Sequence, residues 1–176
     1  MRKRGNLMMT VVFFSLSGLL AAGERLEIKG SFGSGLKNGI PEGWHANKPG
    51  NWDEPGKVSL GKIPDTEKYA LRITSQTKAM HLYYGTPWPI AMSDKCVIKA
   101  IVRGKGMGEL GIYTYPWCGM PSKEFRATDE WTECVAEVPV RKATPETETI
   151  RIVIVVSPGA SIEFMDVNAE MVKTQE

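Results

Sequence analysis

The stretch Thr149 to Ser157, TIRIVIVVS, is dense in β-branched apolar side chains, and Arg151 carries its only charge. Successive side chains of a strand point to opposite faces. One face of this stretch is therefore formed by large aliphatic side chains, those of Ile150, Ile152, Ile154 and Val156. Because the other face is also largely apolar, the pattern predicts a central strand whose first face lies on the core of the domain.

Short segments with strand character recur along the chain, separated by runs rich in Gly and Pro, such as KPGNWDEPG (48–56), RGKGMG (103–108) and YPWCGMP (115–121). These are residues that turns favour. We therefore predict strands near 26–29, 43–46, 58–62, 69–75, 80–84, 96–103, 109–115, 132–138, 150–157 and 162–172. About ten strands at this spacing indicate one all-β domain over residues 24–176, a two-sheet antiparallel β-sandwich.

Residues 1–23 have the features of a secretory signal peptide. Arg2, Lys3 and Arg4 precede an apolar run, and small residues lead up to Gly23. An uncleaved membrane anchor is the rival interpretation, but the apolar run is shorter than a bilayer-spanning helix. We expect cleavage after Gly23, no membrane association afterwards, and a secreted or extracytoplasmic protein, in the periplasm or at the cell surface.

The charge balance disfavours nucleic acid and anionic membranes as partners. Loss of the signal peptide removes Arg2, Lys3 and Arg4 from the 22 Lys and Arg residues, which leaves one fewer basic residue than the 20 acidic ones. Nucleic acids require a concentrated basic face. The remaining chain of about 150 residues suffices for one domain with a substantial core.

The chain has three cysteines, Cys96, Cys118 and Cys134. The two-residue period places Cys96 and Cys134 on the core faces of their strands. Two interpretations stay open for this pair: buried thiols that act as small apolar side chains, or a disulfide, which an oxidising compartment permits if the Cα atoms lie within about 7 Å. Cys118 lies in a loop and has no evident partner.

Several segments occur in an order typical of one family: GSF (30–32), IPEGWHA (40–46), YALRITS (69–75), KCVIKAIVRGKG (95–106), DEWTECVAEVPV (129–140) and IEFMDVNAEMV (162–172). This order resembles the galactose-binding-like jelly roll of carbohydrate-binding modules. The resemblance implies that Trp44 and Trp131 are core residues. The family often holds a structural calcium with a Glu soon after the first Phe and an Asp in the last strand. Here Gly33 follows Phe32 and only Asp166 matches, a departure that argues against calcium. A lone Asp166 is more typical of a hydrogen-bonding residue at a turn or strand end, and we expect no metal and no cofactor.

Tyr113, Tyr115 and Trp117 are spaced by two residues. On a strand they share one face, roughly 6 to 7 Å apart, opposite Leu110 and Ile112. An exposed aromatic row can stack on the flat C–H face of a sugar ring and is unusual on a monomer. The alternative is that the tyrosines pack under a neighbouring loop with their hydroxyl groups outward.

Further candidates extend this site. Trp52 and Trp88 lie among Pro and Gly residues, where the alternative is a lid over the open end of the sandwich, favoured for Trp88. His81 and Tyr83 share one face of their strand. Arg103 stands in an outward row of cations, a pattern more typical of a solvated sheet face, and is included as an additional candidate.

No catalytic residue is predicted, because His45 and His81 lack metal-ligand spacing and no nucleophile or phosphate-loop motif occurs. The sequence therefore favours a secreted, non-catalytic carbohydrate-binding domain that stacks aromatic rings on an oligo- or polysaccharide. The alternative is a structural or adhesive β-sandwich that contacts another secreted or surface protein.

Overall fold

Antiparallel strands make up nearly all of the structure, a computed structural model. It describes residues 24–26, 28, 32–37, 39–46, 57–90, 95–116, 119–140 and 148–173. The predicted signal peptide and the predicted site residues Trp52 and Trp117 lie outside the described residues, as does Cys118. The elements are β1 Glu24–Leu26, the short 3₁₀ helix η1 Phe32–Ser34, β2 Leu36–Lys37, β3 Ile40–Pro41, β4 Trp44–Ala46, β5 Lys57–Lys62, β6 Tyr69–Thr74, β7 Met80–Tyr84, β8 Trp88–Pro89, β9 Lys95–Tyr115, β10 Ser122–Ala127, β11 Thr132–Pro139, β12 Thr149–Val156 and β13 Ser161–Val172.

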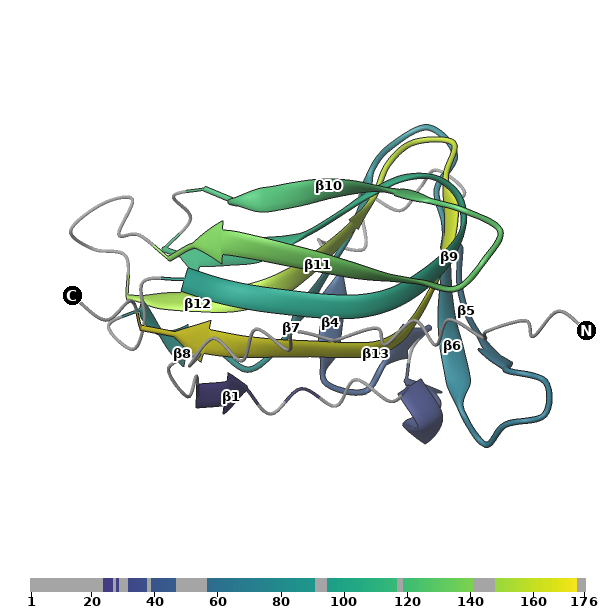
Figure 1. Ribbon diagram of the computed structural model, residues 1–176, viewed down its shortest axis with the longest axis horizontal. Helices are drawn as coiled ribbons and strands as arrows, with labels where there is room; N and C mark the ends of the chain where they lie inside the picture. Colours follow the sequence, from purple (N-terminus) through teal and green to yellow (C-terminus); the bar gives the residue numbers. More distant parts are fainter. Residues whose placement is uncertain are drawn as a thin grey trace, which may run out of the picture.

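The strands form two layers that are joined through the long strand β9 (Figure 1). The first half of β9 belongs to a sheet with the order β11-β9-β13-β6-β5, with β1 also paired to β13. We call it the back sheet, a name that does not refer to the direction of view in Figure 1. The second half belongs to the front sheet, in the order β10-β9-β12-β7-β4, with β8 also paired to β12. This arrangement confirms the predicted all-β, antiparallel sandwich.

Strand β9 passes from the back sheet to the front sheet through a glycine-rich bend. The sequence RGKGMG was predicted to be a turn between two strands, and that prediction is wrong. Gly104 and Gly106 have φ angles of 135° and 104°, which side chains with a Cβ rarely adopt. A Cβ on Gly104 would collide with the carbonyl oxygen of Ser161, and one on Gly106 would lie 2.5 Å from the Cβ of Ala160. The glycines therefore bend the strand against β13 without ending it.

Strand β10 was not predicted. Its sequence, SKEFRA, is rich in charged residues, and Phe125 is its only large apolar side chain. Phe125 packs against the core and contacts Phe164 edge-on, with ring centroids 6.2 Å apart. Among the described strands, β9 is the one partner of β10, which lies at the edge of the front sheet. An edge strand with one buried side chain carries a weak apolar pattern, which explains the omission.

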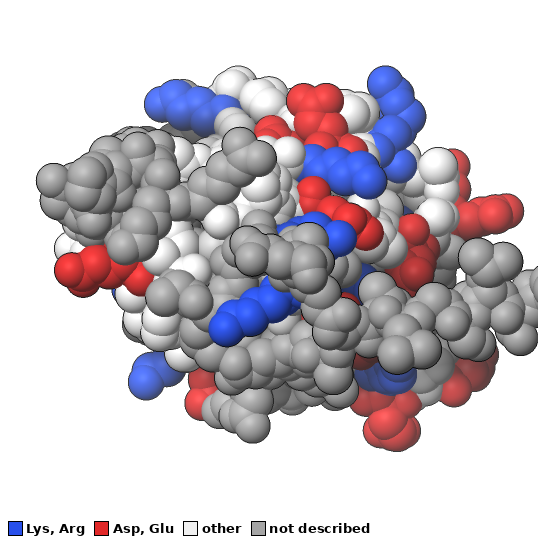
Figure 2. All heavy atoms as spheres, turned by 60° about the vertical axis from the view of Figure 1, so that its left-hand side comes forward, with Lys and Arg blue, Asp and Glu red and all other residues white. Residues whose placement is uncertain are grey.

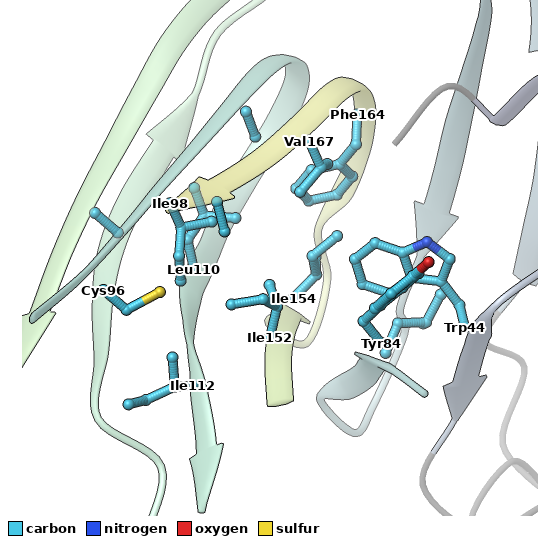
Figure 3. Packing of buried hydrophobic residues seen from close by; sticks show 14 of the residues in the cluster. Trp44, Tyr84, Cys96, Ile98, Leu110, Ile112, Ile152, Ile154, Phe164 and Val167 are labelled. Atoms are coloured by element: carbon cyan, nitrogen blue, oxygen red, sulfur yellow. The ribbon is translucent and has the colours of Figure 1, made fainter. Parts of the chain in front are cut away.

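The core lies between the two sheets, and the predicted inward face of β12 is part of it. Figure 3 shows Ile152 and Ile154 of β12 packed between Leu110 of β9 and Phe164 of β13. Each such side chain contributes about 1.5–3 kcal/mol on burial. Trp44 closes one end of the core, where its ring meets that of Tyr84 at 5.5 Å in an edge-on contact. The prediction that Trp44 is a core residue is confirmed.

Cys96 and Cys134 are both free thiols. The register of β9 with β11 pairs Cys96 with Val138 and Cys134 with Ala100. The two cysteines are therefore four residues out of register, which corresponds to about 13 Å along the strands. This distance excludes the disulfide and leaves the interpretation that both thiols act as small apolar side chains. Cys96 is fully buried, and burial raises the pKa of its thiol to about 12.

Among the described residues, no helix is long and apolar enough to cross a membrane.

Candidate functional site

The outer face of the front sheet carries an aromatic row. On β9, Tyr113 and Tyr115 point outward, because Ile112 and Thr114, which alternate with them, are buried. This orientation agrees with the face predicted from the two-residue spacing.

His81 and Tyr83 of β7 point to the same outer face, as predicted. The residues that alternate with them, Met80, Leu82 and Tyr84, all belong to the core. His45 of β4 joins them, because β4 pairs with β7 in a register that sets His45 beside Tyr83.

Three rings on this face form one stack. His45 stacks on Tyr83 with ring centroids 5.7 Å apart and planes 26° from parallel. Tyr83 in turn stacks on Tyr113, at 5.9 Å and 20°. Strands β7 and β9 lie on either side of β12, so their backbones are roughly 10 Å apart and the two tyrosine rings must lean toward each other across β12.

Beneath the stack lies Val153 of β12, which pairs with Tyr83 on one side and Gly111 on the other. Although Val153 points outward, only 1% of its surface is exposed. The leaning rings account for this burial. The stack therefore adds apolar contact outside the main core and fixes the orientation of its own members.

Tyr115 is the open ring of the row. It lies at the end of β9, paired with Thr149 of β12, and 57% of its surface is exposed. It is two residues beyond Tyr113, on the same face. Its exposure makes Tyr115 the most accessible of the three tyrosine rings on this face, because Tyr83 and Tyr113 are half-buried.

Two glycines shape the face. A Cβ on Gly85 would lie 2.5 Å from Nε2 of His45, so the missing side chain makes room for the imidazole. A Cβ on Gly111 would lie 2.5 Å from the carbonyl oxygen of Pro121. Because Gly111 has no side chain, this oxygen can approach and accept a hydrogen bond from the N–H of Ile112 at 2.9 Å. The two glycines therefore allow His45 and the Pro121–Ser122 segment to pack closely against the sheet.

The other end of the face is polar. His81 and Glu109 both pair with Val155 of β12, one from each side. Burial lowers the pKa of His81, while the negative charge of Glu109 acts in the opposite direction. The hydroxyl group of Ser122 donates a hydrogen bond to Glu109 Oε2 at 2.5 Å.

Arg151 lies in the middle of the aromatic row. It pairs with Tyr113 in the register of β12 and β9, and its guanidinium carbon is 5.7 Å from the ring centroid of Tyr83. Burial raises the pKa of Tyr113, as does neighbouring Tyr83, while the charge of Arg151 acts against this shift. The row thus combines aromatic rings with a positive charge.

Trp88 does not join the row. Its ring stacks on Tyr84 at 5.7 Å with planes only 12° apart, and it packs against the core. Because β8 pairs Trp88 with Ile150, which is fully buried, the indole lies on the inner side of the front sheet. This placement matches the alternative given for Trp88, a ring that closes the sandwich.

Arg103 lies on the back sheet, away from the aromatic row. It forms an ion pair with Glu163, and its guanidinium carbon is 4.6 Å from the ring centroid of Trp131. Arg72 pairs with the same carboxylate. Burial alone would raise the pKa of Glu163, but the hydrogen bonds and charges of the two arginines outweigh it and lower that pKa. The prediction that Trp131 is a core residue is wrong, because its half-buried ring supports Arg103 at the surface.

Asp166, which matches one position of the family's calcium site, forms an ion pair with a lysine. It lies in a bulge of β13, where the register with β9 shifts between Met165 and Asn168, and its φ is 52°. Its carboxylate pairs with Lys68 Nζ at 2.5 Å. In the parts of the chain that the structure describes, no group of three or more His, Cys, Asp or Glu side chains could hold a metal ion. A hydrogen-bonding role for Asp166, as expected, agrees with these contacts.

Acidic and basic side chains are mixed over the surface. Figure 2 shows Lys and Arg side chains next to Asp and Glu side chains across the part of the molecule in view. Lys95 of β9 and Glu137 of β11, which are offset by two residues in the register of these strands, pair at 2.8 Å. The hydrogen bond from Lys95 and its charge lower the pKa of Glu137. A solvated, paired face is what the sequence pattern predicted for this part of β9.

His45 and Arg151 are the members of the site that the sequence did not single out. Each stands at an outward position of a predicted strand, and this position was the feature of the sequence that could have identified them. Their contact with Tyr83 depends on the order of the strands in the sheet, which periodicity does not give.

Comparison with known proteins identifies the fold. No protein-family model and no curated protein matches the chain. The CBM22-1 xylan-binding domain of Xyn10C from Paenibacillus barcinonensis matches with 15% identity over 88% of this chain and 98% of that chain, at a TM-score of 0.53. A carbohydrate-binding module of family 29 matches with 13% identity over 79% and 86%, at 0.50. A cyclase from Fischerella sp. TAU matches with 9% identity over 88% and 100%, at 0.64.

These likenesses confirm the predicted fold, a jelly-roll sandwich similar to that of carbohydrate-binding modules. At such low identities they assign the fold and no more. Because a cyclase shares this fold, the function has to be inferred from the side chains of the site.

Proposed function

We propose that this domain binds an oligo- or polysaccharide on the outer face of its front sheet and catalyses no reaction. The observation that carries the proposal is the aromatic row on that face, formed by the stacked rings of His45, Tyr83 and Tyr113 and the open ring of Tyr115. Sugar rings have flat apolar C–H faces with hydroxyl groups at their edges. Aromatic rings with polar groups beside them complement both features.

The members of the row have different roles in this proposal. Tyr83 has a ring on each side, His45 and Tyr113, so it offers its edge and hydroxyl group, while its flat faces are occupied. Tyr115, with 57% of its surface exposed, stacks on the C–H face of a sugar. The mutual stacking holds the inner rings in place before the ligand arrives, which lowers the entropic cost of binding.

Trp117 and Trp52 extend this site in the proposal. Trp117 follows Tyr115 by two residues in the sequence, just beyond the end of β9. Trp52 has the neighbouring acceptors Asp53 and Glu54. With the predicted signal peptide, the domain acts outside the cytoplasm, where polysaccharides are accessible. The likeness to a xylan-binding domain agrees with this proposal at the level of the fold.

A glycan array followed by titration calorimetry tests the proposal. Tyr115→Ala removes the exposed ring, so we expect it to weaken saccharide binding by about 1–3 kcal/mol, by analogy with bases stacked on aromatic rings. The melting temperature should not change, since the ring is largely outside the packed structure. Tyr69→Ala is the matched control, because Tyr69 is 37% exposed but lies on β6 of the back sheet.

Three results would contradict the proposal. Failure to bind any oligosaccharide, combined with capture of a secreted or surface protein, would favour the alternative of an adhesive sandwich. Release of shortened sugars during incubation with a bound polysaccharide would show catalysis. Equal losses of affinity in Tyr115→Ala and Tyr69→Ala would place the site elsewhere.

A further inference from the structure

Arg151 has an unusual environment for a cation on this sheet. Its Nε atom is buried and has no hydrogen-bond partner among the described residues. The contact that it makes is with the ring of Tyr83, at 5.7 Å from the centroid. By contrast, Arg72 and Arg103 on the back sheet both pair with the carboxylate of Glu163.

Among the residues that the structure describes, the acidic side chains of β9 on this face lie far from Arg151. The nearest of them is Glu109 of β9, which lies four residues before Tyr113, the residue that pairs with Arg151. That separation corresponds to about 13 Å along the strand. Glu109 also accepts a hydrogen bond from Ser122, at the polar end of the face. Its carboxylate therefore does not neutralise the guanidinium group.

A partly buried guanidinium group without an anionic partner is costly, because it has lost water and gained no equivalent hydrogen bond. The contact with Tyr83 offsets only part of this cost, since a cation over an aromatic ring gains about 0.5–2 kcal/mol. A positive charge at this position is thus poorly satisfied in the free protein. A ligand that supplies an anion would satisfy it.

We infer that the ligand of this site is an acidic saccharide, whose negative group binds Arg151 while a neighbouring sugar ring stacks on Tyr115. The inference rests on the proposed function. A uronic acid carboxylate and a sulfate ester both provide the required chemistry. The planar guanidinium fork can donate two parallel hydrogen bonds to either group, and partial burial strengthens the attraction relative to bulk water.

Titration calorimetry with matched acidic and neutral oligosaccharides tests this inference. The probes are oligogalacturonate and its carboxyl-reduced neutral form, and a sulfated galactan oligosaccharide and its desulfated form. We expect at least one acidic probe to bind at least tenfold more tightly than its neutral counterpart. The preference should weaken as salt is raised, because ions screen the attraction. The probe that binds identifies carboxylate or sulfate as the recognised group.

Three variants assign the preference to Arg151. Arg151→Gln should lower the affinity for the acidic probe to that for its neutral form, and Arg151→Lys should retain only part of the preference, because it keeps the charge without the fork. Arg126→Gln removes the same charge at an exposed position of β10 that pairs with Met107, at the far end of the face, and should leave the preference intact. Melting curves of all three exclude unfolding as the cause.

The outcomes separate this inference from the proposed function. If neutral saccharides bind as tightly as acidic ones, or if Arg151→Gln weakens both equally, the inference is wrong while saccharide binding stands. If no saccharide of either kind binds, the proposed function itself fails. A preference that survives in Arg151→Gln would also overturn the role of Arg151.

Discussion

Tyr83 stacks on Tyr113 with ring centroids 5.9 Å apart, although the strands that carry them are separated by β12. This contact spans three strands of the front sheet and covers the outward-facing Val153. It makes the aromatic row a rigid part of the sheet, in contrast to a set of independent surface rings.

Removing the middle ring should therefore destabilise the sheet as well as the site. We expect Tyr83→Ala to lower the free energy of unfolding by about 2 kcal/mol, because two ring contacts are lost and Val153 is uncovered. Tyr83→Phe keeps the ring and should lose much less. Urea unfolding monitored by circular dichroism measures both, and a Tyr83→Ala chain as stable as the original would contradict the stacked arrangement.

The lowered pKa of His81 predicts a specific pH dependence. Burial disfavours the charged imidazole in the folded chain, so the unfolded chain, which titrates near 6.5, takes up a proton first as the pH falls. The free energy of unfolding should decline as the pH drops through 6.5 and level off below the pKa of the folded state.

The His81→Gln chain should lose less unfolding free energy as the pH falls, because it lacks the titrating imidazole. Urea unfolding at pH 7.5 and pH 5.5 compares the two chains, since both values bracket the ordinary His pKa of 6.5 at roughly one unit on each side. If the original chain and the variant lose stability in parallel over this range, His81 is not the group responsible.

The bend of β9 predicts that one glycine cannot be replaced. Gly104→Ala combines a φ of 135° with a collision against Ser161, and we expect a loss of about 3 kcal/mol in unfolding free energy. Gly61→Ala on β5 is the control, because a Cβ there meets nothing within 4 Å. Its stability should be unchanged or slightly higher. Equal effects of the two substitutions in urea unfolding would argue against a continuous bent strand.

The register of β9 and β11 predicts the redox behaviour of the two strand cysteines. In a Cys118→Ser chain, treatment with oxidised glutathione should produce no intramolecular disulfide, because Cys96 and Cys134 are four residues out of register. Cys96 should also resist alkylation in the folded chain, since burial raises its pKa to about 12. Mass spectrometry of the intact chain and of its peptides measures both, and a Cys96–Cys134 peptide would show that the register is different.

The sequence was most informative where side chains alternate without interruption. The core face of β12, the outward positions of Tyr113 and Tyr115 and the shared face of His81 and Tyr83 all follow from the two-residue period, and the structure has them as predicted. The family resemblance implied the same fold, but it also implied a core position for Trp131, which instead supports Arg103 at the surface.

The remaining features depend on which strands are neighbours. Glycines at 104 and 106 favour a turn by composition, yet contact with β13 makes them a bend within β9. The same limit applies to the site. His45, Tyr83 and Tyr113 come from three separate segments, and only the order β9-β12-β7-β4 brings their rings together. No local pattern in the sequence encodes that order.

The central claim, that the outer face of the front sheet binds a saccharide, is tested most directly by amide chemical-shift mapping on isotope-labelled protein. The chain is titrated with the oligosaccharide that binds most tightly in calorimetry. We predict that the shifts concentrate on β7, β9 and β12 around Tyr83, Tyr113 and Arg151, and extend to Tyr115. Shifts confined to the back sheet around Arg72 and Arg103 would contradict the claim.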